Sequence, residues 1–372
     1  MKVQGSIVVI HLVHVIHKYF IWAIVASYIA AAFLPAFGLW IREVDVALLI
    51  APPGKISISL PPLMLAMLVF NAGLGVSLNE LRSAPRKAFM MIAGLFGNLA
   101  APLTMIVMVS LTMRLWHNQD EVQQLLVGLA LVAAMPIAGA STAWAQNASG
   151  SLVLSLGLVL LTTLLSPLTT PLILHAVGFL TSGDYSEDLH ELASGEAATF
   201  LGAWVILPSL LGIVSRQLMN ERLFVQVTPY VKLSNFLILV LLNYSNATLV
   251  LPKVVSLPDP DFLFAVIVIV SVLCVAGFGC GFLLSRAVRA NRSETASLMF
   301  ALGMNNNGAG LVLASLALVD HPQVMLPIIF YNLVQHLFAS LVDFWLQRVG
   351  FRLLVGGGGD EQAQSRLRIP GS

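Results

Sequence analysis

Long hydrophobic stretches, separated by short breaks of charged, Pro or Gly residues, run through most of the chain. The stretches are continuously apolar rather than alternating, which favours membrane helices over the strands of a membrane barrel. A helix needs about 20 apolar residues to cross a hydrocarbon layer about 30 Å thick. Ten segments are predicted to span: 19–41, 59–79, 88–113, 122–146, 150–178, 198–215, 229–251, 262–285, 293–318 and 323–346.

These spans define one ten-helix membrane unit, over residues 19–350. Residues 1–18 are apolar and carry three histidines, so they are predicted to lie at the membrane interface. The connection 182–197 is acidic and is expected to be an external loop. Residues 351–372 contain four successive glycines and mixed charges, and are predicted to be a disordered cytoplasmic tail.

Composition excludes several classes of protein. Of the 372 residues, 58% are hydrophobic and only 10% are charged, and the mean hydropathy is +0.89. A soluble domain carries about 25% charged residues, so a water-soluble enzyme or a disordered chain is excluded. The net charge of +1 provides no basic surface for a nucleic acid. The expected fold is therefore an all-α integral membrane protein, with the lipid bilayer as its surroundings.

The positive charges predict the orientation of the chain in the cell membrane. Lys and Arg gather in the cytoplasmic loops of membrane proteins. With both termini inside, only Arg42, Lys55, Arg114 and Lys253 fall outside. The other fifteen of the 19 basic residues fall on the cytoplasmic side: Lys2, Lys18, Arg82, Arg86, Lys87, Arg216, Arg222, Lys232, Arg286, Arg289, Arg292, Arg348, Arg352, Arg366 and Arg368.

Five spans followed by five more place the two halves in opposite orientations, an arrangement found in many secondary transporters. Repeat one would cover 19–178 and repeat two 198–350. The first span carries a Leu-Pro pair at residues 34–35 and the sixth span carries one at 207–208. These pairs are 173 residues apart, which weakly supports a duplication.

The fourth and ninth spans each contain small and polar residues that should interrupt a helix, at 136–142 and 303–308. Backbone groups left unpaired by such a break are tolerated only inside protein or beside a water-filled cavity. Two interrupted helices at matching positions indicate a central binding site, where helix N-termini attract anions and C-terminal carbonyls attract cations. Close helix packing remains the alternative for the fourth span. The expected helix-breaking residues are Pro136, Gly139, Gly303 and Gly308.

Around these motifs the chain resembles the bile acid:sodium symporter family, within the bile/arsenite/riboflavin transporter superfamily. The resemblance extends over about 18–350. It is carried by 71–75, 136–150 with Ser155, 165–171, 303–308, and Asn332 with Gln335. It implies ten helices in two inverted five-helix repeats. Spans 1, 2, 6 and 7 would form a panel, and the remaining six a core in which spans 4 and 9 are unwound and cross. Transport would follow alternating access.

The resemblance also implies where a coupling sodium ion would bind. The position of the family's shared glutamate is Ala301 in this chain, whereas a buried cation normally needs a countercharge. A sodium site would therefore rest on neutral oxygens, and a sodium-independent facilitator or channel stays open. A family glutamine of the third span falls near Asn98. The implied sodium ligands are Ser141, Thr142, Ser155, Asn305 and the main-chain carbonyls of Leu302 and Met304.

Other polar residues in the ninth and tenth spans are candidate substrate ligands: Asn306, Asn307, Gln335 and His336. His336 lies near the middle of its span, where an ionisable group suggests a function. It could hold an anion or carry a coupling proton, which leaves a proton-coupled carrier open. A neutral imidazole bonded between helices is the simpler interpretation.

The hypothesis is a secondary active transporter of an organic anion, bile-acid-like or a small carboxylate, coupled to sodium. Catalytic motifs such as Gly-x-Ser-x-Gly or a phosphate-binding loop are missing from the sequence, so no enzyme is expected. A membrane sensor is a weaker alternative. No cofactor is expected besides a coupling sodium ion, and no nucleic-acid partner; the oligomeric state stays open.

Overall fold

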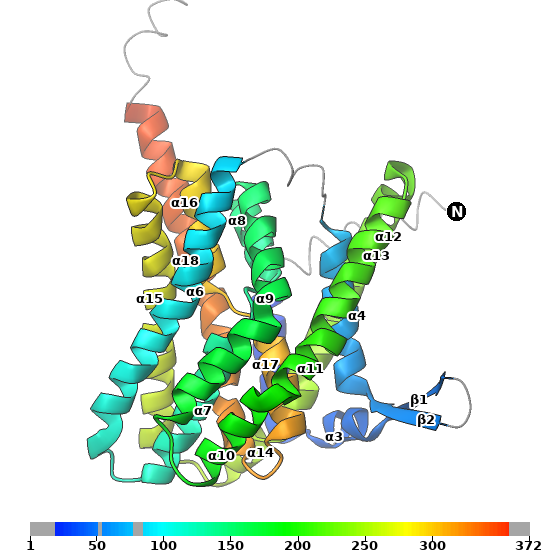
Figure 1. The fold of residues 1–372 in the computed structure, drawn as a ribbon, viewed down its shortest axis with the longest axis vertical. Helices are drawn as coiled ribbons and strands as arrows, with labels where there is room; N and C mark the ends of the chain where they lie inside the picture. The colour runs from blue at the N-terminus through cyan, green and yellow to red at the C-terminus, as the bar shows by residue number, and fades with distance from the viewer. Residues whose placement is uncertain (1–18, 51–53, 77–84, 357–372) are drawn as a thin grey trace, which may run out of the picture.

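Helices make up most of the chain in the computed structural model, which describes residues 19–50, 54–76 and 85–356 (Figure 1). Within these ranges six helices are long and apolar enough to cross a membrane, or seven if one bent pair is a single span. An all-α membrane protein is therefore confirmed at this level. The long helical segments are α6 (Pro85–Thr112), α9 (Leu152–Gly178), α10 to α12 (Asp184–Leu218), α13 (Glu221–Ala247), α15 (Pro260–Ala287) and α18 (Met325–Gly356).

The first predicted span is not one straight helix. It consists of α2 (Phe20–Phe33) and α3 (Ala36–Glu43), which are bent by 92°. Pro35 explains the bend, because proline has no N–H to continue the helix and its ring clashes with the preceding turn. The prediction of a continuous span over 19–41 was wrong in this respect.

A β-hairpin follows the bent pair, and the sequence analysis missed it. Strands β1 (Asp45–Ile50) and β2 (Gly54–Ser59) pair antiparallel, with Asp45 opposite Ser59. The hairpin leads directly into α4 (Leu60–Leu74), the core of the second predicted span. The alternation of apolar and polar residues in this short connection between the first two spans was too weak to predict strands beside the long apolar segments.

The acidic connection 182–197 is helical rather than a loop. It contains α10 (Asp184–Glu191), a π-helical turn (Leu192–Glu196) and α11 (Ala197–Leu201), and a second π-helical turn (Gly202–Ile206) leads into α12 (Leu207–Leu218). Acidic residues in the first turn of α10 favour a helix start, which the loop prediction overlooked.

The predicted ends of the chain are only partly covered. Helix α18 continues to Gly356, so the first six residues of the predicted disordered tail are helical. Phe351 to Val355 contain no helix breaker, and the glycine run begins only after them. Residues 1–18 and 357–372 lie outside the described residues.

The fourth and ninth predicted spans are interrupted, as the sequence indicates. The first consists of α7 (Gln119–Ala134) and α8 (Ala140–Asn147), and the second of α16 (Arg292–Gly303) and α17 (Asn307–Ala317). Shorter elements complete the described chain: the 3-10 turns Met113–Leu115 and Pro322–Val324, and α14 (Leu251–Ser256).

The helices pack in two groups. Helices α2, α4, α12 and α13 lie against one another, and we refer to them with α3 as the panel. Helices α6, α7, α8, α9, α15, α16, α17 and α18 form a larger group, the core. The panel lies on the right of the molecule in Figure 1. In both interrupted spans the break lies midway between the two ends of the core.

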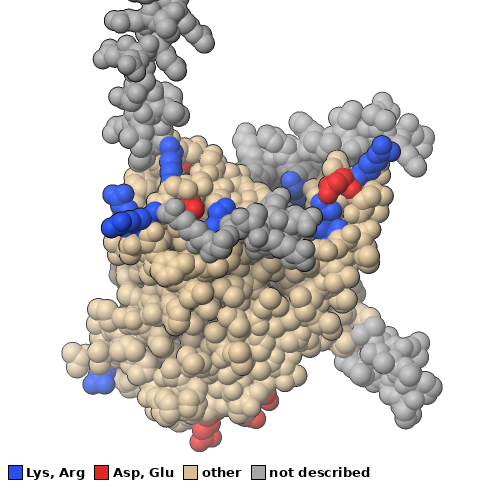
Figure 2. All heavy atoms as spheres, turned by 45° about the horizontal axis from the view of Figure 1, so that its top comes forward, with Lys and Arg blue, Asp and Glu red and all other residues tan. Residues whose placement is uncertain are grey.

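Charge is unevenly distributed between the two ends. Figure 2 shows Lys and Arg gathered around the end of the molecule that is uppermost in Figure 1. The start of α6, the turn between α12 and α13 and the turn between α15 and α16 lie at this end. We call it the basic end.

Helices α4 and α12 approach each other closely at Gly212. A methyl group on Gly212 would lie 2.1 Å from the main-chain oxygen of Phe70, whereas one on Gly279 would meet no atom within 4 Å. Gly212→Ala should therefore force the helices apart and destabilise the protein by about 1–3 kcal/mol. Thermal unfolding in detergent measures this. Gly279→Ala, which also replaces a helical glycine, is the control, and equal shifts in the two variants would contradict the packing argument.

Candidate functional site

The two helix breaks bind one another directly through their main chains. Ile137 and Asn305 form an antiparallel bridge. The N–H of Ala138 donates to the oxygen of Met304 at 3.0 Å, and the N–H of Asn306 donates to the oxygen of Pro136 at 2.8 Å. Peptide groups released by the breaks therefore find partners in each other. We call this contact the crossing.

Pro136 creates a second need at the crossing, which Asn305 meets. A proline cannot donate to the carbonyl four residues earlier, so the oxygen of Val132 has no partner within its helix. The side-chain Nδ2 of Asn305 donates to that oxygen at 2.8 Å. The main-chain N–H of Asn305 donates to Oε1 of Gln335 at 3.1 Å. Asn305 thus ties together α7, the break in the ninth span and α18.

Hydroxyl groups of α9 bind the other free peptide groups of the first break. Oγ1 of Thr170 donates to the oxygen of Ala134 at 2.5 Å, and Oγ1 of Thr162 accepts the N–H of Ile137 at 3.2 Å. Both threonines are buried. The sequence analysis missed both residues. Several threonines in the apolar stretch of α9 could have suggested hydrogen-bond partners for the interrupted fourth span.

A polar network extends from the crossing to the panel. Nε2 of Gln335 donates to Oδ1 of Asn332 at 3.3 Å. Nδ2 of Asn332 lies 2.8 Å from the hydroxyl of Tyr28 in α2 and 3.2 Å from Oδ1 of Asn243 in α13. Tyr28 and Asn243 were not predicted. A buried network of this kind ties panel and core together through donors and acceptors that water cannot reach.

The predicted helix-breaking residues act in different ways. Pro136 and Gly303 are buried, and a methyl group on Gly303 would lie 2.5 Å from the ring of Phe278. A methyl group on Gly139 or Gly308 would make only ordinary contacts, the nearest at 3.5 Å to Ala72 and at 3.6 Å to Asn306. The three glycines all lack a positive φ, so their role is close packing or exposure of backbone rather than a left-handed turn. The side chain of Asn306 caps α17 by accepting the N–H of Ala309 at 3.3 Å.

Unpaired polar atoms concentrate on the residues that the sequence singled out. Among the described residues, nine carry a buried side-chain N or O without a hydrogen-bond partner. Two of them, Asn243 and Asn246, lie in α13 and were not predicted. Seven were: Asn98, Ser141, Thr142, Ser155, Asn305, Asn307 and His336. Such atoms are costly inside a membrane protein, and binding sites are where the cost is recovered.

Several of these atoms suit a hard cation, which prefers oxygen ligands. Oγ of Ser141 and Oγ1 of Thr142 project from the first turn of α8, Oγ of Ser155 from the first turn of α9, and Oδ1 of Asn305 from the crossing. The Met304 carbonyl already accepts a bond from Ala138 and keeps one lone pair for a ligand. Gly277 packs against the Leu302 carbonyl.

Ala301 lies in an apolar environment. It is fully buried in a cluster with Ile137, Leu154, Leu158 and Leu298. Two acidic residues of α16 and α18 already have hydrogen-bond partners. Glu294 caps the start of α16, and the carboxylate of Asp343 accepts hydrogen bonds from the side chain of Gln347. The position where the resemblance implies a glutamate is therefore surrounded by apolar side chains in this chain.

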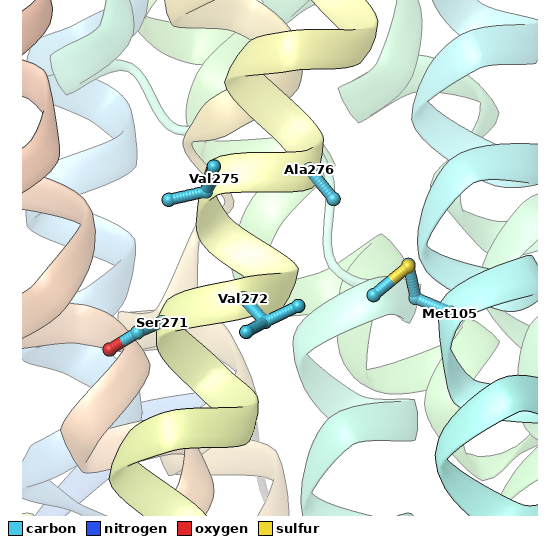
Figure 3. Close-up of a pocket in the computed structure, with 5 residues that line it drawn as sticks. All are labelled: Met105, Ser271, Val272, Val275 and Ala276. Atoms are coloured by element: carbon cyan, nitrogen blue, oxygen red, sulfur yellow. The ribbon is translucent and has the colours of Figure 1, made fainter.

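One groove among the described residues lies away from the crossing. It lies between α6 and α15, has a volume of about 410 Å³ and is lined by Met105, Ser271, Val272, Val275 and Ala276 (Figure 3). Its walls are apolar apart from Ser271, whose hydroxyl points away from Met105 in Figure 3.

A helical membrane protein with two interrupted helices joined at a buried polar crossing has the features of a secondary transporter. Comparison with known proteins agrees: residues 62–256, more than half of the chain, match the Sodium Bile acid symporter family. The chain belongs to this family and is a membrane transporter.

Two relatives from Bacillus subtilis (strain 168) are similar to most of the chain. The "uncharacterized protein YbaS" is 26% identical over 292 residues, which cover 77% of this chain and 88% of the relative. The "uncharacterized sodium-dependent transporter YocS" is 22% identical over 292 residues, which cover 77% of this chain and 83% of the relative.

The hydroxyl groups of α9 allow a matched test of the crossing. Thr170→Val should leave the oxygen of Ala134 without a partner and cost about 1–3 kcal/mol of stability. Neighbouring Thr169→Val is the control, because that hydroxyl donates only to Leu165 of its own helix. Thermal unfolding of the purified variants should show a lower midpoint for Thr170→Val alone. An unchanged midpoint for Thr170→Val would show that this hydrogen bond does not stabilise the crossing.

Proposed function

We propose that the protein is a secondary active transporter which moves an organic anion together with sodium by alternating access. The crossing carries the proposal: two broken helices bind one another through their main chains while buried side-chain oxygens around them remain unpaired. A purely structural crossing would leave no reason for that many unpaired polar groups.

The proposal includes ten spans in two inverted repeats. Besides the long helices, α4 and the two interrupted pairs would each cross the membrane. The bridge between Ile137 and Asn305 joins the breaks of the two halves. Nδ2 of Asn71 also donates to Oδ1 of Asn235 at 2.7 Å. These residues are 164 apart, the same offset as between Ser141 and Asn305.

Alternating access would arise from movement of the panel against the core. The network through Asn332 joins the two groups with hydrogen bonds that can break and re-form. In contrast, the main-chain bonds of the crossing lie within the core and would move with it.

The substrate class follows from the helix ends. Helices α8 and α17 both begin at the crossing, so two N-termini with partial positive charge meet there. Asn306 is partly exposed in this region and Asn307 has an unpaired amide. An anion with a carboxylate or sulfonate group would be favoured there. Bile-acid-like anions and small carboxylates are both compatible.

Sodium coupling rests on the neutral oxygens of Ser141, Thr142, Ser155 and Asn305. One relative is named a sodium-dependent transporter, which supports the same assignment. A site without a fixed carboxylate should bind sodium weakly, because hydroxyl and amide dipoles stabilise a charge less than a carboxylate does.

A sodium-independent facilitator is the second candidate, and the apolar cluster around Ala301 favours it. Proton coupling through His336 is a further variant. Its Nδ1 is buried and unpaired, and its ring lies edge-on to Phe20 with centroids 5.0 Å apart. Acid-stimulated uptake that is lost in His336→Ala would identify that variant.

The proposed location is the cell membrane, with the basic end in the cytoplasm. The distribution of Lys and Arg supports this orientation, in which both termini would lie inside. The opposite end, which holds α3, the hairpin and α14, would face outwards, and we call it the outer end.

Substitutions at the crossing test the site. Ser141→Ala and Asn306→Ala should each reduce uptake at least about 10-fold, because each removes a polar group that binds ion or substrate. Radiolabelled cholate, taurocholate, benzoate and pyruvate serve as substrates in proteoliposomes. Ser256→Ala, an exposed serine of α14, is the control. Full uptake by both crossing variants, with normal protein amounts, would refute the site.

Replacing sodium tests the coupling. Uptake of any transported anion should collapse when external sodium is exchanged for potassium. Ser155→Ala should raise the sodium concentration for half-maximal uptake about 10-fold, since one oxygen ligand to a charged ion is lost. Equal uptake in both salts would instead establish the facilitator.

A further inference from the structure

Arg42 at the end of α3 has a partly buried guanidinium with only neutral partners. Its Nη1 donates to Oδ1 of Asn246 at 2.7 Å, and its Nη2 donates to the oxygen of Ser315 at 3.4 Å. Within the described part of the chain it forms no ion pair. A charge that is partly removed from water and left without a countercharge is costly. A guanidinium has five N–H donors, so three remain for a ligand.

Local structure fixes the position of this side chain. The bend at Pro35 turns α3 across the end of α13 (Figure 1). The hydroxyl of Tyr244 donates to the oxygen of Leu34 and accepts the N–H of Gly38, which binds both sides of the bend to α13. A methyl group on Gly38 would lie 2.5 Å from Thr248, so α3 contacts α13 closely. Arg42 follows Gly38 by one turn and therefore lies on the same face.

Next to Arg42 is an independent sign of a ligand. Nδ2 of Asn246 is completely buried and has no partner, although Oδ1 of the same amide binds Arg42. One turn closer to the crossing, Nδ2 of Asn243 is also fully buried and unpaired. Arg42 therefore keeps three N–H donors beside the buried, unpaired amide of Asn246, and the unpaired amide of Asn243 lies one turn further along α13.

These donors form a track towards the crossing. Leu242 lies close to the position of Gly308, so this part of α13 faces the first turn of α17, where Asn307 has an unpaired amide. Oδ1 of Asn243 joins the network that passes through Asn332 and Gln335 to Asn305. The track begins at Arg42 on the outer end and finishes at the crossing.

We infer that Arg42 and Asn246 form an outer docking site which receives the carboxylate or sulfonate of the carried anion before it reaches the crossing. The inference rests on the proposed function, because it concerns the same substrate. Arg presents paired N–H donors that match both oxyanions, and the amide of Asn246 adds a neutral donor. Asn243 and Asn307 would receive the anion next.

A brace between panel and core is the competing role for Arg42, since it already contacts Ser315 of α17. The two roles differ in kinetics. Loss of a docking group weakens the binding of external anion and raises KM, whereas loss of a brace changes the rate of the conformational step and alters the maximal rate.

The test is uptake of external cholate, taurocholate, benzoate and pyruvate by cells that produce the protein. For each anion that the wild type takes up, Arg42→Gln should raise KM about 10-fold or more and change the maximal rate by less than about 2-fold. Arg42→Lys should recover part of the loss, because it restores the charge without the fork. Arg114→Gln is the matched control, an exposed arginine in the 3-10 turn that follows α6.

The possible results of this experiment distinguish failure of the docking site from failure of the proposed function. An unchanged KM with a lower maximal rate in Arg42→Gln would overturn the docking site and establish a brace, while transport itself stands. An unchanged KM and an unchanged rate would also overturn it. A wild-type protein that takes up none of the four anions would overturn the proposed function and the docking site together.

Discussion

The structure depends on one constraint: inside a bilayer, every peptide N–H and C=O must find a partner within the protein. Continuous helices meet it automatically except where a proline removes an N–H, as at Pro102 in α6 and Pro229 in α13. The two interrupted helices do not. Their breaks satisfy the constraint by pairing with each other, through the Ile137–Asn305 bridge, and with side chains from α9 and α18. The crossing is therefore a necessity of folding, and on the proposed function it is also the binding site.

Side chains at the same place follow the opposite rule. The backbone of the crossing is bonded, whereas the oxygens of Ser141, Thr142 and Ser155 and part of the amide of Asn305 are left without partners. A folded protein gains nothing from burying such groups unpaired, and replacing them with apolar residues would remove the penalty. Their presence makes sense when a transported ion or molecule supplies the missing partner. Rigid backbone and unsatisfied side chains together give a preorganised site, since little has to be ordered when the ligand arrives.

How much of this could be predicted from sequence differs between levels. Apolar length and the Pro and Gly positions predicted an all-α membrane protein and both interruptions, because these depend on local chemistry. Seven of the nine residues with unpaired buried atoms also follow from polar residues in apolar segments. Tyr28, Asn243 and Asn246 could not be found in that way, since their importance depends on which helices become neighbours. The bend at Pro35 was misjudged because a proline can kink a span or end it, and only packing on α13 decides between them.

Charge balance connects the crossing with Arg42. Where a family member would hold a carboxylate, this chain has Ala301 among leucines, so no fixed negative charge stabilises sodium there. On the proposed function, the carried anion becomes the nearest negative charge to a bound sodium ion, and each of the two would favour the binding of the other. By reciprocity, the gain in sodium affinity on binding the anion equals the gain in anion affinity on binding sodium. A fixed carboxylate would bind sodium even without substrate; its absence makes sodium binding depend on the anion. The guanidinium of Arg42, which has no countercharge among the described residues, fits this order, because as an outer docking site it would attract the anion first, before sodium has any strong ligand at the crossing.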